Sequence, residues 1–426
     1  MNKIFIYLIL FILITNCSID NKSGIWSSSK KKINNKEEKL LSKVTQTLNK
    51  EYNSNIKVKI NDNYSKNNFN NYSNNFAVLN YNGNLKEIGR YKFSKIENFQ
   101  IYRPDLTFTS NGNLIYFDGK GAIFKLNKNF DIIWKKNFYT KKEKKLSPIL
   151  NLSVYKNNII ISDNLSNIYN VNSITGKLEW KKKNDAAFNS QIKILDNKIY
   201  LVDLNNTLKC ISLIDGSNLW QYKSENTLIK STKKISLIIF KNKVIFLNSV
   251  GDINALDTEN GNLLWQAPLI NSSIYDNSFS TVFSELVLNG KSIYVSNNKN
   301  EFFSINSNTG VVRWRKKINS SQTPIITKDL IFTITEEGYL VVLNKKNGDL
   351  IRSTKIKTKK NKLINFGFLV TKNNIYLSSN SNLIIIDIMS GKFKKSVKIS
   401  RNLISKPYIY KKSLYFITDK NIKKYN

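Results

Sequence analysis

The chain has 426 residues, of which 41% are hydrophobic and 12% aromatic, enough to build a large packed core. Lysine and arginine number 67 against 30 aspartate and glutamate residues, which gives a formal net charge of +37. There is no histidine, which excludes histidine-containing zinc sites, Ser-His-Asp triads and Cys-His dyads.

The N-terminus has the pattern of a secreted lipoprotein. Lys3 precedes an apolar run from Ile4 to Ile14, which at about eleven residues is too short to span a bilayer as a helix but suits a signal-peptide core. The cysteine that follows, Cys17, resembles the lipobox cysteine of bacterial lipoproteins, which is acylated and becomes the mature N-terminus. We therefore expect a signal peptide at residues 1–16 and a lipid anchor at Cys17. An ordinary secretory signal with an incidental cysteine is the alternative.

A polar tether is expected to follow the anchor. Residues 35–52 place Leu40, Leu41, Val44 and Leu48 at helical spacing among charged residues, which predicts one short amphipathic helix. Residues 61–75 are almost entirely Asn, Ser, Tyr and Lys, a composition that buries too little apolar surface to offset chain entropy. We assign residues 17–75 to a lipid-anchored tether and residues 76–426 to the folded domain.

From residue 76 the chain repeats a unit of four short strands. In each unit the turn between the third and fourth strands ends in glycine, and tryptophan follows four residues later. The complete pairs are Gly176/Trp180, Gly216/Trp220, Gly261/Trp265 and Gly310/Trp314. An earlier unit has Trp134 with Phe130 in the glycine position, and two later units keep Gly348 and Gly391 but have Arg352 and Lys395 in the tryptophan position. The units are roughly 40 to 50 residues long, the length of a four-stranded propeller blade.

Each residue type in the repeat has a local structural reason. The glycines supply the positive φ of a tight hairpin, and the recurring tryptophans are expected to pack between blades. The second strands, such as Ile199–Val202, are continuously apolar, which predicts burial on both faces. Lysines follow the tryptophans, where they would protect an exposed outer strand from intermolecular pairing. This accounts for much of the positive charge, and without a recognition helix or an aromatic RNA-binding signature we expect no nucleic-acid partner.

Counting second strands gives eight units, so the sequence predicts an all-β, eight-bladed β-propeller of four-stranded antiparallel blades. A seven-bladed ring is the alternative. The last unit ends at Asn426 without a fourth strand, whereas residues 82–93 form a turn and a fourth strand with nothing before them. We predict that residues 76–93 supply the outer strand of the blade formed by residues 403–426 and so close the ring.

The repeat, seen best at residues 172–180 and 306–314, resembles that of pyrroloquinoline-quinone-type propellers. Together with the lipobox and the short tether, it resembles the BamB-like family of outer-membrane assembly lipoproteins. The resemblance implies a non-catalytic scaffold, lipid-anchored on the periplasmic side of the outer membrane, that binds the periplasmic domains of a BamA-type barrel insertase. It implies no catalytic residue, cofactor or metal.

Two alternatives to this reading remain. One is a propeller that binds another protein, a glycan or a lipid. The other is a quinoprotein dehydrogenase using pyrroloquinoline quinone and calcium, although the chain lacks the vicinal cysteine pair of such enzymes.

Overall fold

The computed structural model describes residues 56, 72–75, 79, 81, 83–102, 104–225, 233–270, 281–356 and 365–426. The chain divides into two units, Met1–Glu51 and Tyr52–Asn426, and all described residues belong to the second. The expected signal peptide, Cys17, the amphipathic helix and most of the tether therefore lie outside the described residues. None of the helices that are described is both long and apolar enough to cross a bilayer.

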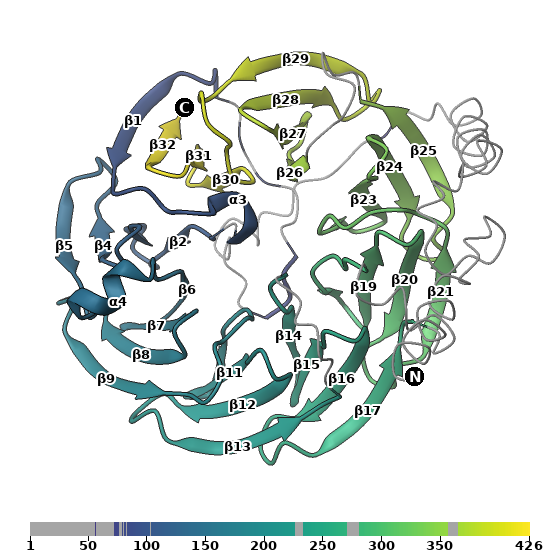
Figure 1. Cartoon of the computed structure of the whole chain (residues 1–426). Coiled ribbons are helices and arrows are strands. Elements are labelled where there is room, and N and C mark those ends of the chain that lie inside the picture. Colours follow the sequence, from purple (N-terminus) through teal and green to yellow (C-terminus); the bar gives the residue numbers. More distant parts are fainter. Residues whose placement is uncertain are drawn as a thin grey trace, which may run out of the picture. The chain divides into compact units, whose positions relative to one another are not determined.

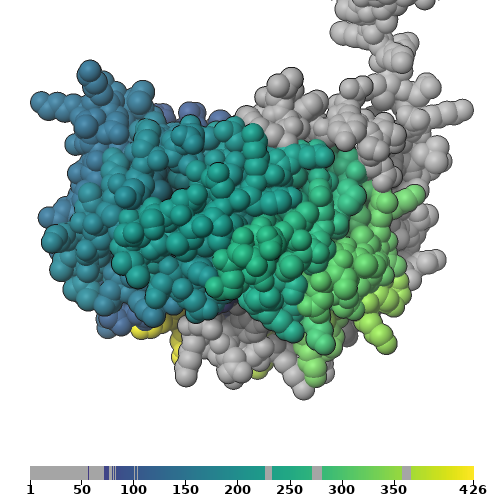
Figure 2. All heavy atoms as spheres, turned by 90° about the horizontal axis from the view of Figure 1, so that it is seen from below, coloured from purple at the N-terminus to yellow at the C-terminus, as the bar shows by residue number. Residues whose placement is uncertain are grey.

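In the unit Tyr52–Asn426, eight four-stranded antiparallel sheets follow one another around a ring (Figure 1). In every blade the four strands lie side by side, with the first at the centre of the ring and the fourth at its rim. This confirms the eight-bladed propeller and rules out the seven-bladed alternative. Figure 2 views the ring from its rim, with the outer strands of the teal and green blades toward the viewer.

Blades 1 to 4 take up the first half of the ring. Blade 1 comprises β2 (Thr107–Phe108), β3 (Leu114–Phe117), β4 (Ile123–Leu126) and β5 (Ile132–Lys136). Blade 2 comprises β6 (Leu150–Tyr155), β7 (Asn158–Asp163), β8 (Asn167–Asn172) and β9 (Leu178–Lys183). Blade 3 comprises β10 (Lys193–Leu195), β11 (Lys198–Val202), β12 (Thr207–Ser212) and β13 (Asn218–Lys223). Blade 4 comprises β14 (Leu237–Phe240), β15 (Lys243–Leu247), β16 (Asp252–Asp257) and β17 (Leu263–Pro268).

Blades 5 to 8 complete the ring. Blade 5 comprises β18 (Val287–Asn289), β19 (Ser292–Asn297), β20 (Glu301–Asn306) and β21 (Val312–Lys316). Blade 6 comprises β22 (Ile325–Ile326), β23 (Leu330–Ile334), β24 (Tyr339–Asn344) and β25 (Leu350–Lys355). Blade 7 comprises β26 (Asn365–Val370), β27 (Asn374–Ser379), β28 (Asn382–Asp387) and β29 (Phe393–Lys398). Blade 8 comprises β30 (Tyr408–Tyr410), β31 (Ser413–Ile417), β32 (Asn421–Tyr425) and β1 (Glu87–Lys92). Two short helices, α3 (Phe99–Tyr102) and α4 (Lys141–Lys145), lie in connections.

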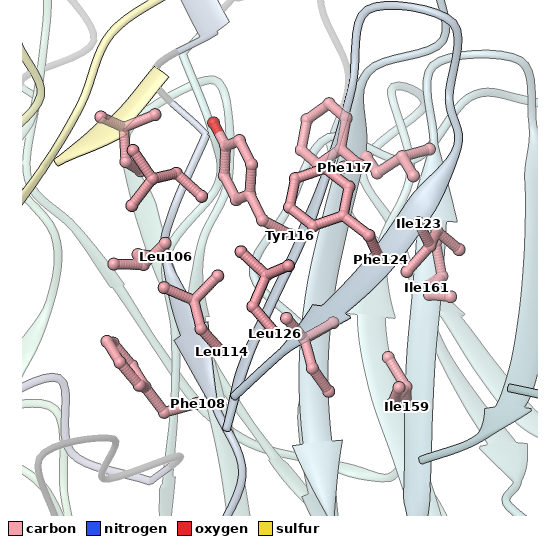
Figure 3. Close-up of a cluster of buried hydrophobic side chains, with 14 of the residues drawn as sticks. Leu106, Phe108, Leu114, Tyr116, Phe117, Ile123, Phe124, Leu126, Ile159 and Ile161 are labelled. Carbon is pink, nitrogen blue, oxygen red and sulfur yellow. The ribbon is translucent and has the colours of Figure 1, made fainter. Parts of the chain in front are cut away.

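The core lies between the faces of neighbouring blades. Every residue of β3 is buried, as is all of β7 except its first. Figure 3 shows part of this packing: Ile123 of β4 lies beside Ile161 of β7 in the next blade. Phe124, the next residue of β4, faces the other way, and its ring centroid lies 4.8 Å from that of Tyr91 in β1 of blade 8. The second strands are apolar throughout because each is covered on both faces by adjacent blades.

Blade 8 is built from both ends of the folded domain. Strand β1 pairs antiparallel with β32, with Lys92 opposite Asn421 and Glu87 opposite Tyr425. The Lys86 amide donates to the Asn426 carbonyl at 3.1 Å, and the Asn426 amide donates back at 3.0 Å. The predicted closure of the ring by residues 76–93 is confirmed.

The two ends of the ring differ in their connections. At one end, here called the hairpin end, the first strand turns into the second in every blade, and the third turns into the fourth in blades 1 to 7. At the other, the crossover end, the second strand turns into the third and the chain passes to the next blade. Both kinds of turn at the hairpin end are short, so that end presents tight turns side by side.

Candidate functional site

The repeated glycines and tryptophans meet at the seams between blades. Each turn glycine has a positive φ, and in five of the six the tryptophan of the preceding blade covers it. A Cβ built on Gly261 would lie 2.5 Å from Cε3 of Trp220, closer than real side chains approach. The seam pairs are Trp134 with Gly176, Trp180 with Gly216, Trp220 with Gly261, Trp265 with Gly310 and Trp314 with Gly348. Glycine thus leaves room for an indole at each of these seams.

Hydrogen bonds orient three of the indoles. Nε1 of Trp180 donates to the Leu213 carbonyl at 3.0 Å, and Trp134 and Trp220 donate to the corresponding carbonyls, each three residues before the turn glycine. Burial is not uniform along the seams. Trp134 and Trp180 are buried, whereas the other three tryptophans are only partly buried.

In the sixth blade Arg352 takes over the role of the indole. Its side chain is 1% exposed and lies over Gly391, and Nη2 donates to the Ile388 carbonyl at 3.0 Å, the carbonyl that a tryptophan would use. A second bond runs from Nη1 to the Met389 carbonyl. Burial lowers the pKa of Arg352 to about 10. Lys395, in the same position of blade 7, is exposed.

The seam between blades 8 and 1 reverses the pair. The register of β1 places Gly89 in the tryptophan position, one residue after the same irregularity that precedes each tryptophan. Phe130 occupies the glycine position with φ +72°, and its ring lies 3.1 Å from a Cβ built on Gly89. The large side chain comes from the turn here and the small residue from the outer strand. The turn expected at residues 82–85 places Leu85, with φ +64°, in the glycine position of blade 8.

Residues 72–75, the short purple trace beside β14 in Figure 1, pack against the inner strands that line the central channel. The Tyr72 and Ser73 carbonyls accept hydrogen bonds from the inner strands of blades 4 and 5, both at 2.9 Å. The Asn75 side chain bonds to Ile326 of blade 6, and the Leu79 amide donates to the Val370 carbonyl of blade 7. We call residues 72–75 and 79 the strap.

Asn74 connects the strap to the surrounding blades. Its Nδ2 donates to the Leu237 carbonyl at 3.0 Å and the Leu286 carbonyl at 2.9 Å, which belong to blade 4 and the start of blade 5. Its Oδ1 accepts from Nζ of Lys193 at 2.5 Å. Lys193 is buried, and burial lowers its pKa to about 7. One buried amide therefore connects the strap to the inner strands and to a buried lysine.

Charged groups span the channel toward the crossover end. Asp105 of blade 1 pairs with Lys406 of blade 8 at 2.8 Å and with Lys234 of blade 4 at 3.2 Å, and it accepts a hydrogen bond from Tyr408 at 3.0 Å. Burial by itself would raise the pKa of Asp105, but the two lysines hold it well below its usual range. The space left among Asn74, Asp105 and their neighbours is a cavity of about 110 Å³.

The described residues contain no cluster of three or more metal-ligating side chains. The thiol of Cys210 is fully buried, and burial raises its pKa to about 12, which keeps it protonated and unreactive.

The residues that fill the channel could not be found from the sequence. Asn74 lies in a run of Asn, Ser and Tyr that predicts a tether, and Asp105 and Lys193 carry no motif. Their partners lie more than one hundred residues away. No local signal marks them.

Comparison with known proteins identifies one family of β-propellers that this chain matches. Residues 120–354 match the family model described as outer membrane protein assembly factor BamB. The outer membrane protein assembly factor BamB of Legionella pneumophila is 23% identical over 167 residues, which are 37% of this chain and 41% of that protein. The match thus spans about two fifths of the length of that curated relative.

Solved structures show the same fold. The crystal structure of BamB from Moraxella catarrhalis superposes with a TM-score of 0.66 at 13% identity, over 80% of this chain and 99% of that one. A quinohemoprotein alcohol dehydrogenase from Pseudomonas putida superposes with a TM-score of 0.59 at 10% identity, over 81% and 76%. At such identities the likeness is one of fold alone. The family match, in contrast, covers more than half of the sequence, and this chain therefore belongs to the BamB family of repeat propellers.

Proposed function

We propose that this protein is a non-catalytic scaffold of outer-membrane β-barrel protein assembly, and that it binds the periplasmic domains of a BamA-type insertase. The observation that carries the proposal is the match of residues 120–354 to a family described as an outer membrane protein assembly factor. The matched segment runs through blades 2 to 5, the two outer strands of blade 1 and nearly all of blade 6, so the repeats themselves carry the likeness.

The interior of the ring supports a scaffold rather than an enzyme. Sites for small molecules and cofactors are clefts of roughly 300–1,000 Å³. Among the described residues, the space beside Asn74, Asp105 and Lys193 in the channel measures about 110 Å³. That space is smaller than a quinone cofactor requires, which supports placing the function on the outer surfaces of the ring.

The proposal includes attachment to the outer membrane on its periplasmic side through a lipid on Cys17. Its support is the short apolar run before Cys17 in the sequence. The alternative of a propeller that binds another protein, a glycan or a lipid differs from this proposal in its partner and not in its fold.

Affinity isolation of the detergent-solubilised full chain from its own cells tests the partner. We expect the barrel insertase to be recovered in amounts close to those of the tagged chain. The Cys17→Ser variant is the matched control: it removes the lipid and should still bind the insertase when detergent extracts are mixed. Recovery of glycan or of unrelated proteins without the insertase would overturn the assignment.

A second assay addresses the enzyme alternative. Adding pyrroloquinoline quinone with Ca²⁺ should leave the melting temperature of the full chain unchanged, because a ligand that binds the folded state raises it. A concentration-dependent rise would favour the dehydrogenase.

A further inference from the structure

Exposed apolar side chains gather at the hairpin end of the propeller. Of the 17 large hydrophobic residues exposed among the described residues, 12 lie in the turn between the third and fourth strands or within the first three residues of the outer strand. The 12 are Ile88, Ile132, Ile133, Ile174, Ile214, Leu219, Leu263, Leu264, Val311, Val312, Met389 and Phe393. Contiguous exposed apolar surface on a soluble domain commonly marks a contact with a partner or a membrane.

The charge at this end is uneven around the ring. Blades 7, 8 and 1 carry six exposed lysines in their hairpin-end turns, which we call the basic sector: Lys372, Lys392, Lys411, Lys412, Lys86 and Lys128. Blades 3 and 4 instead expose Asp196, Asp215 and Glu259 at the same end. Other exposed lysines lie in the hairpin-end turns of blades 2, 4, 5 and 6, namely Lys156, Lys177, Lys241, Lys291, Lys328 and Lys346. Lysines are therefore densest in blades 7 and 8 but are not confined to them.

Of the three described acidic groups within the basic sector, Asp387 and Glu87 form ion pairs, whereas Asp131 beside Lys128 is exposed and accepts a hydrogen bond from Asn127. Asp387 pairs with Lys394 at 2.9 Å, and Glu87 pairs with Arg90 at 2.7 Å and with Lys423 at 3.2 Å. Neither carboxylate pairs with one of the six lysines of the sector. The apolar side chains among these lysines are Met389, Phe393, Ile88, Ile132 and Ile133.

The chain that precedes the propeller joins it beside this sector. Ile56 is buried, and its amide donates to the carbonyl of Met389, in the hairpin-end turn of blade 7, at 3.3 Å. The 55 residues before it contain the apolar run Ile4–Ile14 and Cys17. Ile56, the first described residue after them, therefore lies at the hairpin end of the ring.

We propose that the basic sector is a docking surface for an anionic lipid bilayer, on which the propeller rests with its hairpin end. The inference builds on the proposed membrane attachment and adds which face meets the lipid. Peripheral binding combines burial of apolar side chains in the interface with attraction of lysines to anionic headgroups. Both are present here within three consecutive blades, next to the point where the tether arrives.

Vesicle flotation of the full chain tests the proposal. The Cys17→Ser chain removes lipidation, and vesicles of phosphatidylcholine with 30% phosphatidylglycerol, roughly a cell-like anionic fraction, are compared with pure phosphatidylcholine. The test variant is Lys372→Gln/Lys411→Gln/Lys412→Gln. The matched control is Lys141→Gln/Lys142→Gln/Lys145→Gln, which removes three exposed lysines from α4 at the crossover end.

Each lysine close to an anionic surface strengthens binding about fivefold, so the test variant should lose about 100-fold in partitioning to anionic vesicles while the control keeps wild-type binding. Binding to pure phosphatidylcholine reports the apolar N-terminus and should be equal in all three chains. A second pair, Met389→Ser/Phe393→Ser against Ile214→Ser in the acidic part of the ring, should weaken binding only in the former.

Equal losses in the test and control variants would overturn the proposal, because they would indicate attraction by net charge alone. Unchanged vesicle binding with lost recovery of the insertase would assign the basic sector to a protein partner instead. The vesicles contain no protein, so failure of this proposal and failure of the scaffold assignment are read from different experiments.

Discussion

A glycine at a blade seam should tolerate no side chain, and Gly261→Ala measures the cost. With φ +74°, alanine at this position would be strained by about 1–2 kcal/mol. Its Cβ would also lie 2.5 Å from Cε3 and 2.7 Å from Cδ2 of Trp220. Pushing the indole away overpacks the seam, which costs about 1–3 kcal/mol. We therefore expect Gly261→Ala to reduce the free energy of unfolding by about 2–5 kcal/mol.

The chain offers a matched control in Gly290, which has φ +61° and nothing within 4 Å of a built Cβ. Gly290→Ala should show only the backbone strain, about 1–2 kcal/mol. Urea unfolding followed by far-ultraviolet circular dichroism compares the two. If both substitutions shift the midpoint equally, the indole contact contributes nothing and the reasoning is refuted. With Trp220→Ala in the same chain, the extra cost of Gly261→Ala should disappear.

Four further outcomes are expected. Gly89→Trp should destabilise the fold by about 1–3 kcal/mol, because the new indole meets the ring of Phe130. Phe130→Gly in the same chain should recover that loss in a double-mutant cycle. If the two effects simply add, the large and small residues are not exchanged at the seam between blades 8 and 1. Arg352→Trp should raise the free energy of unfolding in urea by about 1 kcal/mol or more, because it replaces a buried cation that pairs with no carboxylate among the described residues. A loss above about 1 kcal/mol would indicate that the two hydrogen bonds to carbonyls stabilise the fold more than the buried charge costs. Burial lowers the pKa of Lys193 from 10.5 to about 7, so between these values the unfolded chain binds more protons than the folded chain. The free energy of unfolding should therefore rise with pH from about 7 to 10.5. The rise should be smaller in Lys193→Met, and identical pH profiles of the two chains would exclude this lysine as its source. Deletion of residues 415–426 removes β32 and most of β31, so the melting temperature should fall; an unchanged value would deny their role in closing the ring.

The repeated parts of the fold were accessible from the sequence. Gly176, Gly216 and the other turn glycines mark hairpins that need positive φ, and apolar runs such as Ile199–Val202 mark strands covered on both faces. The incomplete last unit and the unpaired first strand predicted the shared blade. Each of these features repeats or completes a neighbouring unit, so the units of this one chain can be compared with one another.

The departures from the repeat were less accessible. Arg352 was identified as a replacement for tryptophan, but its burial and its bonds to the turn carbonyls depend on the facing blade. The exchange of Gly89 and Phe130 depends on the register between β1 and β32, strands from opposite ends of the domain. Register is set by long-range pairing, which a local pattern does not report.

The sequence by itself determined the blade, the number of blades and the way the ring closes, because turn chemistry and strand periodicity are local properties repeated eight times. Only the tertiary structure decided what fills the channel and where the charges lie. Asn74 reaches three blades, and Asp105 pairs with lysines of blades 4 and 8, through contacts that exist only once the ring has brought distant segments together. The same closure collects dispersed turn lysines into the basic sector.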